Sequence, residues 1–295
     1  MNKKYTLSEY AAIINDYIKN VVPLCDFDEP VVHEAMNYSL AIGGKRIRPV
    51  LVLEFCRVCG GDIYKALPFA AALEMIHTYS LIHDDLPCMD NDDMRRGQPA
   101  CHIKFGYEYA LLAGDGLLTH AFSTIADSEL ASEKPDIAIK AVSVLAKCAG
   151  ANGMIGGQVI DLKNENRFAP VEVLERMDKL KTGALIKCAA MLGCICAEAS
   201  ETKLNAAVRY AENIGLAFQI VDDILDATGD ADSLGKPVGS DKESGKSTYY
   251  SLLGAEASRK YADKLTDEAV SALDIFEDEA EFLKELALLL SKRTN

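Results

Sequence analysis

Two short clusters of aspartates stand far apart in this chain, each at the polar end of an apolar stretch. The first runs from Asp84 to Asp90 and the second from Asp222 to Asp226. Two carboxylates about 4 Å apart repel each other by about 4 kcal/mol at an effective dielectric constant of about 20, so clusters of this density favour a bound cation. Carboxylate oxygens suit Mg²⁺, which usually binds a few of them together with substrate phosphates. The clusters therefore predict metal-assisted chemistry on a phosphorylated substrate.

The spacing inside each cluster indicates how its aspartates must be presented. Asp222 and Asp226 are four residues apart, which places both carboxylates on one face of a helix. Asp84 and Asp90 are six apart, and a straight helix with about 3.6 residues per turn would hold them about 120° apart around its axis. Pro87 must therefore break or bend that helix so that Asp90 returns toward Asp84. A single Asp-Asp pair is more often a solvated helix end, but two clusters behind apolar runs favour a metal site.

Cationic side chains occur in three places. They are Lys45 and Arg48, then Arg95 and Arg96, and in the second half Lys181, Lys236 and Lys246. Any one of these is more often a surface charge. In a chain with a formal net charge of −14, their occurrence together with metal-type aspartates predicts a cradle for a diphosphate. Arginine offers forked donors to phosphate oxygens, and lysine offers a mobile point charge.

The elements that must hold these side chains are helices. Apolar residues recur at helical spacing, and the runs end where glycine or proline falls, as at Gly60-Gly61, Pro135 and Pro170. The predicted helices cover about 7–21, 30–41, 46–59, 63–85, 106–131, 136–162, 171–199, 203–228, 254–275 and 278–292, and the first follows a Thr6-x-x-Glu9 capping box. No alternating strands or hairpin dipeptides interrupt them, and 229–247 is the one long irregular segment. We therefore predict a single all-α domain over residues 1–295, with about ten helices.

Composition argues against several function classes. The net charge of −14, from 31 basic and 45 acidic residues, argues against a nucleic-acid partner because that binding needs a basic surface. The longest uninterrupted apolar stretches, such as 188–197, fall short of a membrane span, and the first residues lack the apolar run of a signal peptide. Nine cysteines without a secretory signal indicate reduced thiols and a cytoplasmic location. Cys56-x-x-Cys59 lies on an apolar helical pattern, so we interpret it as packing.

One glycine-rich run leaves two interpretations open. Gly153, Gly156 and Gly157 precede Gln158 and Asp161. The glycines would let a helix pass close to a substrate chain, or they would let two helices pack closely against each other.

Taken in order along the chain, these motifs resemble the trans-isoprenyl diphosphate synthases. The matching segments are Gly43–Pro49, Asp84–Asp90 with Arg95-Arg96, Lys181-Thr182-Gly183, Phe218-Gln219 and Asp222–Asp226. The resemblance covers nearly the whole chain and is closest to the bacterial farnesyl diphosphate synthases, whose first aspartate motif also has two extra residues. It implies an all-α bundle of the isoprenoid synthase type around a central cavity, and a homodimer.

The resemblance also implies roles for individual residues. Asp84, Asp90, Asp222 and Asp226 would hold Mg²⁺ against an allylic diphosphate, supported by Asp85 and Asp223, with about three ions per site and Mn²⁺ as the alternative metal. Arg95, Lys181 and Lys236 would bind the same diphosphate, and Lys246 would approach it from the 229–247 loop. Lys45, Arg48, His77 and Arg96 would bind isopentenyl diphosphate, although a lone histidine on an apolar helix is otherwise more often a core residue. Thr182 and Gln219 would turn the negative ends of their dipoles toward a carbocation.

The most detailed prediction concerns the length of the product. Tyr79 lies five residues before Asp84, with Ser80 beside it, and five residues of helix span about 7.5 Å. A bulky aromatic at this place resembles the farnesyl-length pattern, so Tyr79 would be the floor of a tunnel of limited depth. The implied reaction joins isopentenyl diphosphate to dimethylallyl or geranyl diphosphate and gives farnesyl diphosphate, with a geranylgeranyl diphosphate synthase as the alternative.

Three rival functions explain less of the sequence. A metal-dependent phosphohydrolase would use His77, His83-Asp84 and Asp222, but it leaves the cations unexplained. A terpene cyclase needs no second diphosphate site for an acceptor. A catalytically silent partner subunit would be expected to lack aspartates or Lys181, and none is missing.

Overall fold

The computed structural model describes residues 3–23, 28–228 and 247–292, and its regular structure is almost entirely helical. The chain divides into two compact units. One is formed by Met1–Ser143 and Ile195–Glu198, the other by Val144–Cys194 and Ala199–Asn295. The boundary falls within two helices, α8 (Pro135–Ala149) and α11 (Gly183–Cys196).

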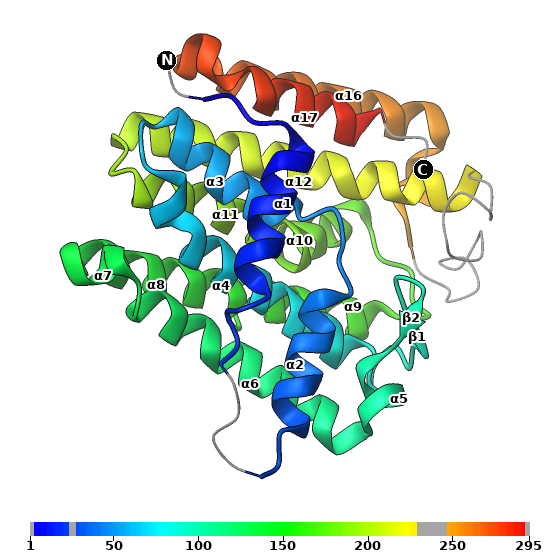
Figure 1. The fold of residues 1–295 in the computed structure, drawn as a ribbon. Helices are drawn as coiled ribbons and strands as arrows, with labels where there is room; N and C mark the ends of the chain where they lie inside the picture. Colours follow the sequence, from blue (N-terminus) through cyan, green and yellow to red (C-terminus); the bar gives the residue numbers. More distant parts are fainter. Residues whose placement is uncertain (1–2, 24–27, 229–246, 293–295) are drawn as a thin grey trace. The chain divides into compact units, whose positions relative to one another are not determined.

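The first unit holds the N-terminal helices (Figure 1). They are α1 (Leu7–Ile18), α2 (Val31–Ala41), α3 (Ile47–Val58), α4 (Ile63–Asp84), α5 (Cys101–Phe105), α6 (Tyr107–Ala126) and α7 (Glu129–Glu133). Between α4 and α5 the strands β1 (Met94–Arg95) and β2 (Gln98–Pro99) form an antiparallel hairpin.

Helix α4 packs between α3 and α6 and forms the centre of this unit. Its buried residues lie on all its sides and include Phe69, Leu73 and Ile76, each fully enclosed. A helix that is apolar all round is one that is buried all round. Helix α3 is buried from Pro49 to Val58. The residues at the C-terminal end of α4 are therefore carried by a helix that is buried on all sides.

A buried ionic cluster joins α1 to α3. The Tyr10 hydroxyl donates to the Glu54 carboxylate, and the Arg57 guanidinium donates to both oxygens of that carboxylate, each at 2.9 Å. Tyr10 and Glu54 are fully buried. Burial, and then the Glu54 charge, raise the pKa of Tyr10 above its ordinary value, so the hydroxyl keeps its proton and remains a donor. Arg57 supplies the cation that a buried carboxylate needs.

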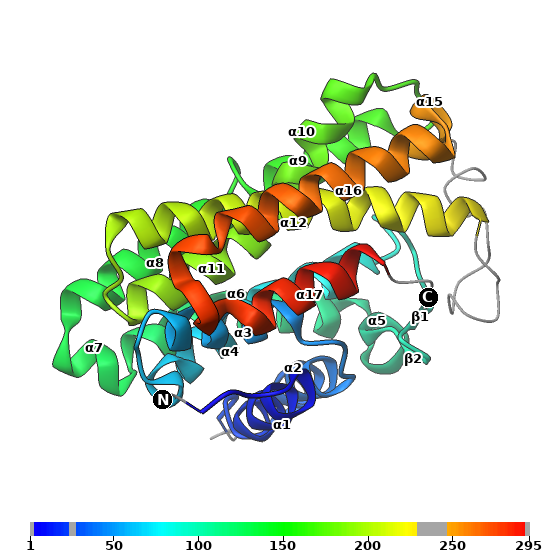
Figure 2. The same cartoon turned by 90° about the horizontal axis from the view of Figure 1, so that it is seen from above.

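The second unit is built around one long helix. Its elements are α9 (Met154–Asn164), α10 (Val171–Lys181), α12 (Glu201–Thr228), α15 (Tyr249–Leu253), α16 (Ala255–Ala272), the 3₁₀ turn η1 (Asp274–Ala280) and α17 (Glu281–Ser291). Helix α16 runs alongside α12, as both Figure 1 and Figure 2 show. The buried Tyr210 of α12 donates its hydroxyl to the Leu283 carbonyl oxygen of α17 at 2.9 Å.

The predicted all-α fold is confirmed, and so is the capping box at Thr6 and Glu9. The described residues hold more and shorter helices than the ten or so predicted. The 136–162 run breaks after α8, where a Cβ at Gly153 would lie 2.0 Å from the Cys148 carbonyl oxygen. The 171–199 run breaks at Thr182, the C-cap of α10.

The prediction that no hairpin interrupts the helices was wrong. Arg96 and Gly97 both have positive φ, 52° and 75°, which is the backbone of a tight two-residue hairpin turn. Asn-Gly is the usual sequence for this turn, and an arginine in its first position gives little warning of it. This turn sets the direction of two predicted ligands, Arg95 and Arg96.

Cys56 is a packing residue, as predicted. It is fully buried, and burial raises its thiol pKa to about 12, so it carries no reactive thiolate at neutral pH.

One helical stretch among the described residues, Pro135–Asn164, is long and apolar enough to cross a membrane by length and composition. It comprises α8 and α9, and 44% of its most apolar window is buried. Core helices pass the same test, so the stretch is weak evidence for a span. The absence of a membrane span stays a prediction.

We expect Arg57→Ala to lower the free energy of unfolding by about 3–5 kcal/mol, because it leaves the Glu54 carboxylate buried without its cation. Denaturant titration followed by circular dichroism measures this change. Lys260→Ala is the matched control, because its partner Glu256 and Lys260 itself are 85% and 75% exposed, and exposed pairs contribute about 0–1 kcal/mol. Equal losses in the two variants would contradict the role given to Arg57.

Candidate active site

The first aspartate cluster lies in the first unit, where α4 ends. Asp84 is the last residue of α4 and Asp85 its C-cap. The chain then turns back, so that the backbone N–H of Asp90 donates to the Asp84 carbonyl oxygen at 2.8 Å. Asp84 is half-buried and Asp90 is exposed. The predicted return of Asp90 toward Asp84 around Pro87 is confirmed.

Asp85 and Arg95 form an ion pair. The Arg95 Nε lies 3.0 and 3.1 Å from the two carboxylate oxygens of Asp85, and its Nη2 also contacts Asp85. Asp85 is 2% exposed, and burial raises its pKa while the Arg95 charge opposes that rise. Arg95 also lies 3.5 Å from Asp92. The hairpin thus fastens Arg95 to the helix end, whereas metal support by Asp85 and diphosphate binding by Arg95 stay predictions.

The two cations just before α3, Lys45 and Arg46, have different roles. Arg46 has φ 51° and is buried. Its guanidinium donates to Glu74 at 2.6 Å, to Asn15 at 2.9 Å and to the Leu40 carbonyl oxygen at 2.6 Å. Arg46 is therefore a structural residue, which fixes the segment on the unit. Lys45, one residue earlier, is exposed and available to a ligand.

Arg48, His77 and Arg96 form what we call the basic cluster. The Arg48 Nη1 lies 3.4 Å from the His77 Nε2, and the Arg96 guanidinium lies against Gly44, where a Cβ would meet its Nη1 at 2.4 Å. Within the described residues no carboxylate forms an ion pair with either arginine, and the buried Nε of Arg48 has no hydrogen-bond partner. Burial and then the Arg48 charge lower the His77 pKa well below its ordinary value, so the ring is neutral at pH 7. Like charges held together in this way favour an anion.

The predicted chain-length residues occupy α4 below this end. Tyr79 is 5% exposed, its ring centroid is 5.7 Å from that of His83, and its buried hydroxyl has no described hydrogen-bond partner. Burial, and then the charge of Asp84, raise the Tyr79 pKa to about 12. The Ser80 hydroxyl donates to the His77 carbonyl oxygen at 2.9 Å.

The second aspartate cluster lies on α12 in the second unit. Asp222 and Asp226 are on one continuous helix, so their four-residue spacing gives them a common face, as predicted. Gln219, three residues before Asp222, is half-buried on the same helix. Asp223 accepts a hydrogen bond from the backbone N–H of Tyr249 at 2.8 Å. Asp223 is thereby oriented by the start of α15.

Lys181 has a partner that the sequence did not indicate. Its Nζ lies 2.6 Å from Asp161 Oδ2, and the two side chains are 28% and 10% exposed. A Cβ at Gly157 would lie 2.1 Å from the Lys181 backbone nitrogen. Of the two interpretations left open for the glycine run, close helix packing is the one seen at Gly157, between α9 and α10.

Asp178 and Tyr249 are further residues that sequence reasoning missed. Asp178 lies one turn before Lys181 and is 5% exposed; burial raises its pKa to about 7. Tyr249 is fully buried, and burial followed by the Asp178 charge raises its pKa. The Tyr249 backbone N–H binds Asp223, and α15, which begins at Tyr249, contacts both α10 and α12.

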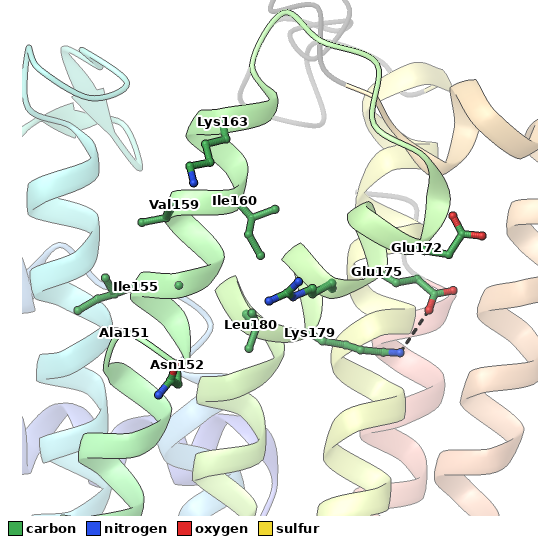
Figure 3. A pocket seen from close by; sticks show the side chains of 12 residues that line it. Ala151, Asn152, Ile155, Val159, Ile160, Lys163, Glu172, Glu175, Lys179 and Leu180 are labelled. Atoms are coloured by element: carbon green, nitrogen blue, oxygen red, sulfur yellow. Dashed lines mark hydrogen bonds and ion pairs between the residues drawn. The ribbon is translucent and has the colours of Figure 1, made fainter.

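A groove of about 720 Å³ lies between α9 and α10 (Figure 3). Ile155, Val159 and Leu180 give it apolar walls, and Lys179 at its rim lies 3.3 Å from Glu175. By helical spacing, Val159 and Lys179 lie on the faces opposite Asp161 and Lys181. The groove is thus distinct from the Lys181 contact.

The described carboxylates suit Mg²⁺ ions that are coordinated partly by the protein and partly by a substrate phosphate. No group of three or more His, Cys, Asp or Glu side chains among the described residues is arranged to hold a metal by itself. Mg²⁺ takes one or two carboxylates and completes its shell with substrate phosphates and water, which fits pairs such as Asp222 and Asp226. Two predicted ligands, Lys236 and Lys246, lie outside the described residues.

An all-α fold with two aspartate clusters and nearby cations is the architecture of isoprenyl diphosphate synthases. A solved FPP/GFPP synthase from Zymomonas mobilis matches with a TM-score of 0.85 and 37% identity over 95% of both chains. A putative farnesyl-diphosphate synthase from Marinomonas sp. MED121 matches with a TM-score of 0.82 and 35% identity, covering 98% of this chain and 100% of that chain. These matches define the class of fold.

Sequence comparison identifies the family. The polyprenyl synthetase model matches residues 29–287. The farnesyl diphosphate synthase of Escherichia coli is 48% identical over 254 residues, 86% of this chain and 85% of the relative. The geranylgeranyl diphosphate synthase of Cyanophora paradoxa is 42% identical over 290 residues, which cover 98% of this chain and 96% of the relative. The chain therefore belongs to the polyprenyl synthetase family and is a trans-prenyltransferase.

We expect inorganic diphosphate to raise the His77 pKa, because the anion would offset the charges of Arg48 and Arg96 that lower it. Protonation of the ring should then begin at higher pH than in the ligand-free protein. Nuclear magnetic resonance of the ring signals over roughly pH 4 to 8, with and without diphosphate, measures the shift.

Arg48→Gln serves as the control for the His77 titration. It should raise the His77 pKa in the ligand-free protein and shrink the response to diphosphate, since it removes the nearest like charge. An unchanged His77 pKa in saturating diphosphate would count against an anion site at the basic cluster.

Proposed function

We propose that this prenyltransferase is a Mg²⁺-dependent farnesyl diphosphate synthase, which adds isopentenyl diphosphate to dimethylallyl and then geranyl diphosphate. The observation that carries the product length is Tyr79, a buried aromatic on α4 five residues before Asp84. The farnesyl diphosphate synthase of Micrococcus luteus, 46% identical over 89% of this chain and 89% of its own length, supports the same product. The similar geranylgeranyl diphosphate synthases keep the longer product as the alternative.

The first step is departure of the allylic diphosphate. The allylic C–O bond breaks, and its electron pair leaves with the diphosphate. When bound, Mg²⁺ supplies positive charge to the leaving oxygens. The proposed ligands of the Mg²⁺ ions are Asp84, Asp90, Asp222 and Asp226; the resemblance to the family is what assigns both clusters to one diphosphate. Lys181 and Arg95 add cationic donors to the phosphate oxygens.

The acceptor diphosphate is assigned to the basic cluster together with Lys45. The two arginines provide forked donors, and neutral His77 provides one N–H and one acceptor nitrogen. Because these cations have no described carboxylate partner, a bound diphosphate would replace their mutual repulsion with attraction. Isopentenyl diphosphate would be anchored through its own diphosphate group, which leaves its double bond free to react.

The carbocation is stabilised by dipoles that cannot trap it. The Thr182 hydroxyl and the Gln219 amide oxygen present negative ends without forming a bond. The π electrons of isopentenyl diphosphate form the new C–C bond, and the departing diphosphate accepts the proton that is lost. A serine, cysteine or histidine nucleophile has no part in this sequence of steps.

A homodimer in the cytoplasm completes the proposal. Helix α6 exposes Tyr109 and Leu112 to 44% and 50%, apolar surface that a second copy would cover. The described cysteines are all free thiols, in keeping with a reducing compartment. Light scattering of the purified protein measures the oligomeric state, and a monomer at micromolar concentration would contradict this part.

The test of the function is incubation with Mg²⁺, isopentenyl diphosphate and either dimethylallyl or geranyl diphosphate, followed by chromatography of the products. Farnesyl diphosphate is the expected main product. Free diphosphate without a new C–C bond between the substrates would support a hydrolase or cyclase. No turnover would support a silent subunit.

We expect Tyr79→Ala to lengthen the product toward geranylgeranyl diphosphate, because it removes the proposed floor of the tunnel. The same extension assay measures the ratio of the two products. Tyr79→Phe is the matched control: it keeps the ring and loses only a hydroxyl without a described partner, so its product should stay farnesyl diphosphate. An unchanged product from Tyr79→Ala would overturn the role of this residue.

A further inference from the structure

The contact between Lys181 and Asp161 is the best-defined interaction of a proposed substrate ligand in the second unit. The Lys181 Nζ lies 2.6 Å from Asp161 Oδ2. Asp161 is buried, with 10% of its side chain exposed, whereas 28% of the Lys181 side chain reaches solvent. The end of the lysine is therefore held by a buried carboxylate, while part of its side chain stays exposed.

Two features of α9 create this contact. Gly157 and Asp161 are four residues apart, so they lie on one face of the helix, a turn apart. At Gly157 the absent side chain lets the backbone of α10 approach at Lys181, where a Cβ would be 2.1 Å from its nitrogen. One turn further along, Asp161 meets the end of the same lysine. Gly157 thus allows the two helices to pack closely, and this close packing brings Asp161 within hydrogen-bond distance of Lys181.

The contact fixes the end of a lysine side chain that is still partly exposed. The ammonium has three N–H donors, and one of them goes to Asp161. Because 28% of the side chain reaches solvent, a phosphate oxygen could approach it there. A lysine without such a partner would distribute its flexible four-carbon chain over many rotamers, and a ligand would have to select one of them.

We propose that Asp161 is a positioning residue that acts through Lys181 to set the affinity for the allylic diphosphate. This inference rests on the proposed function, in which Lys181 binds that diphosphate. Asp161 touches neither substrate in this scheme. It holds the ammonium in the orientation that the diphosphate requires, so its loss raises the KM for the allylic substrate and leaves the KM for isopentenyl diphosphate nearly unchanged.

The test is a double-mutant cycle with Asp161→Asn, Lys181→Gln and the two combined. Asp161→Asn keeps the shape of the side chain and removes its charge. We expect it to raise the KM for geranyl diphosphate roughly tenfold, the size typical of one charged hydrogen bond. Added to Lys181→Gln, it should change kcat/KM by less than about twofold, because the residue through which it acts is gone.

Two further variants separate positioning from folding. Asp161→Glu keeps the charge and should recover part of the affinity lost in Asp161→Asn. Glu212→Gln is the matched control, because it breaks another lysine–carboxylate contact of this unit, 3.1 Å from Lys187 and 50% exposed, and should leave both KM values unchanged.

The possible outcomes distinguish this inference from the function. If the unaltered protein forms no prenyl diphosphate, the proposed function fails. If it is active but Asp161→Asn raises both KM values equally, or its effect multiplies with that of Lys181→Gln, Asp161 is structural and the inference alone is overturned. A KM for geranyl diphosphate within about twofold of the unaltered protein would overturn it as well.

Discussion

Buried carboxylates held by cations are the interaction on which the described structure depends in both units. Glu54 is held by Arg57, Glu74 by Arg46, Asp85 by Arg95 and Asp161 by Lys181. The Glu54–Arg57 pair lies within α3, whereas each of the other three pairs joins two separate segments of one unit. Arg48 and Arg96 lie near His77 and form no ion pair with a described carboxylate, although the charge of Glu74 reaches both. In the proposed function, the acceptor diphosphate supplies the anion that pairs with them.

The same requirement explains why an acidic protein can handle anionic substrates. The net charge of −14 gives no general attraction for a diphosphate. In the proposed function, binding depends instead on a few cations that form no described ion pair, and on metal ions that the aspartate clusters are suited to hold. Arg46 shows how local this arrangement is, because it lies two residues from Arg48 yet is fully engaged by Glu74, Asn15 and Leu40.

The parts of the site that could be predicted from the sequence are those fixed by local constraints. Pro87 forbids continuation of a helix, so the return of Asp90 followed from chain geometry alone. The common face of Asp222 and Asp226 followed from their spacing on an uninterrupted helix. The Asp161–Lys181 contact could not be found in this way, because the two residues are 20 positions apart and meet only through packing at Gly157. The Arg96-Gly97 turn was missed because its first residue is unusual for that backbone.

The packing of Arg96 on Gly44 has a consequence for variation in this protein. These positions are 52 residues apart (96 − 44), yet a Cβ at Gly44 would occupy the space of the Arg96 guanidinium. Gly44 itself has φ 131°, so any other residue there is also strained. A side chain introduced at Gly44 would therefore displace the Arg96 guanidinium, so a substitution at one position changes the geometry of the other.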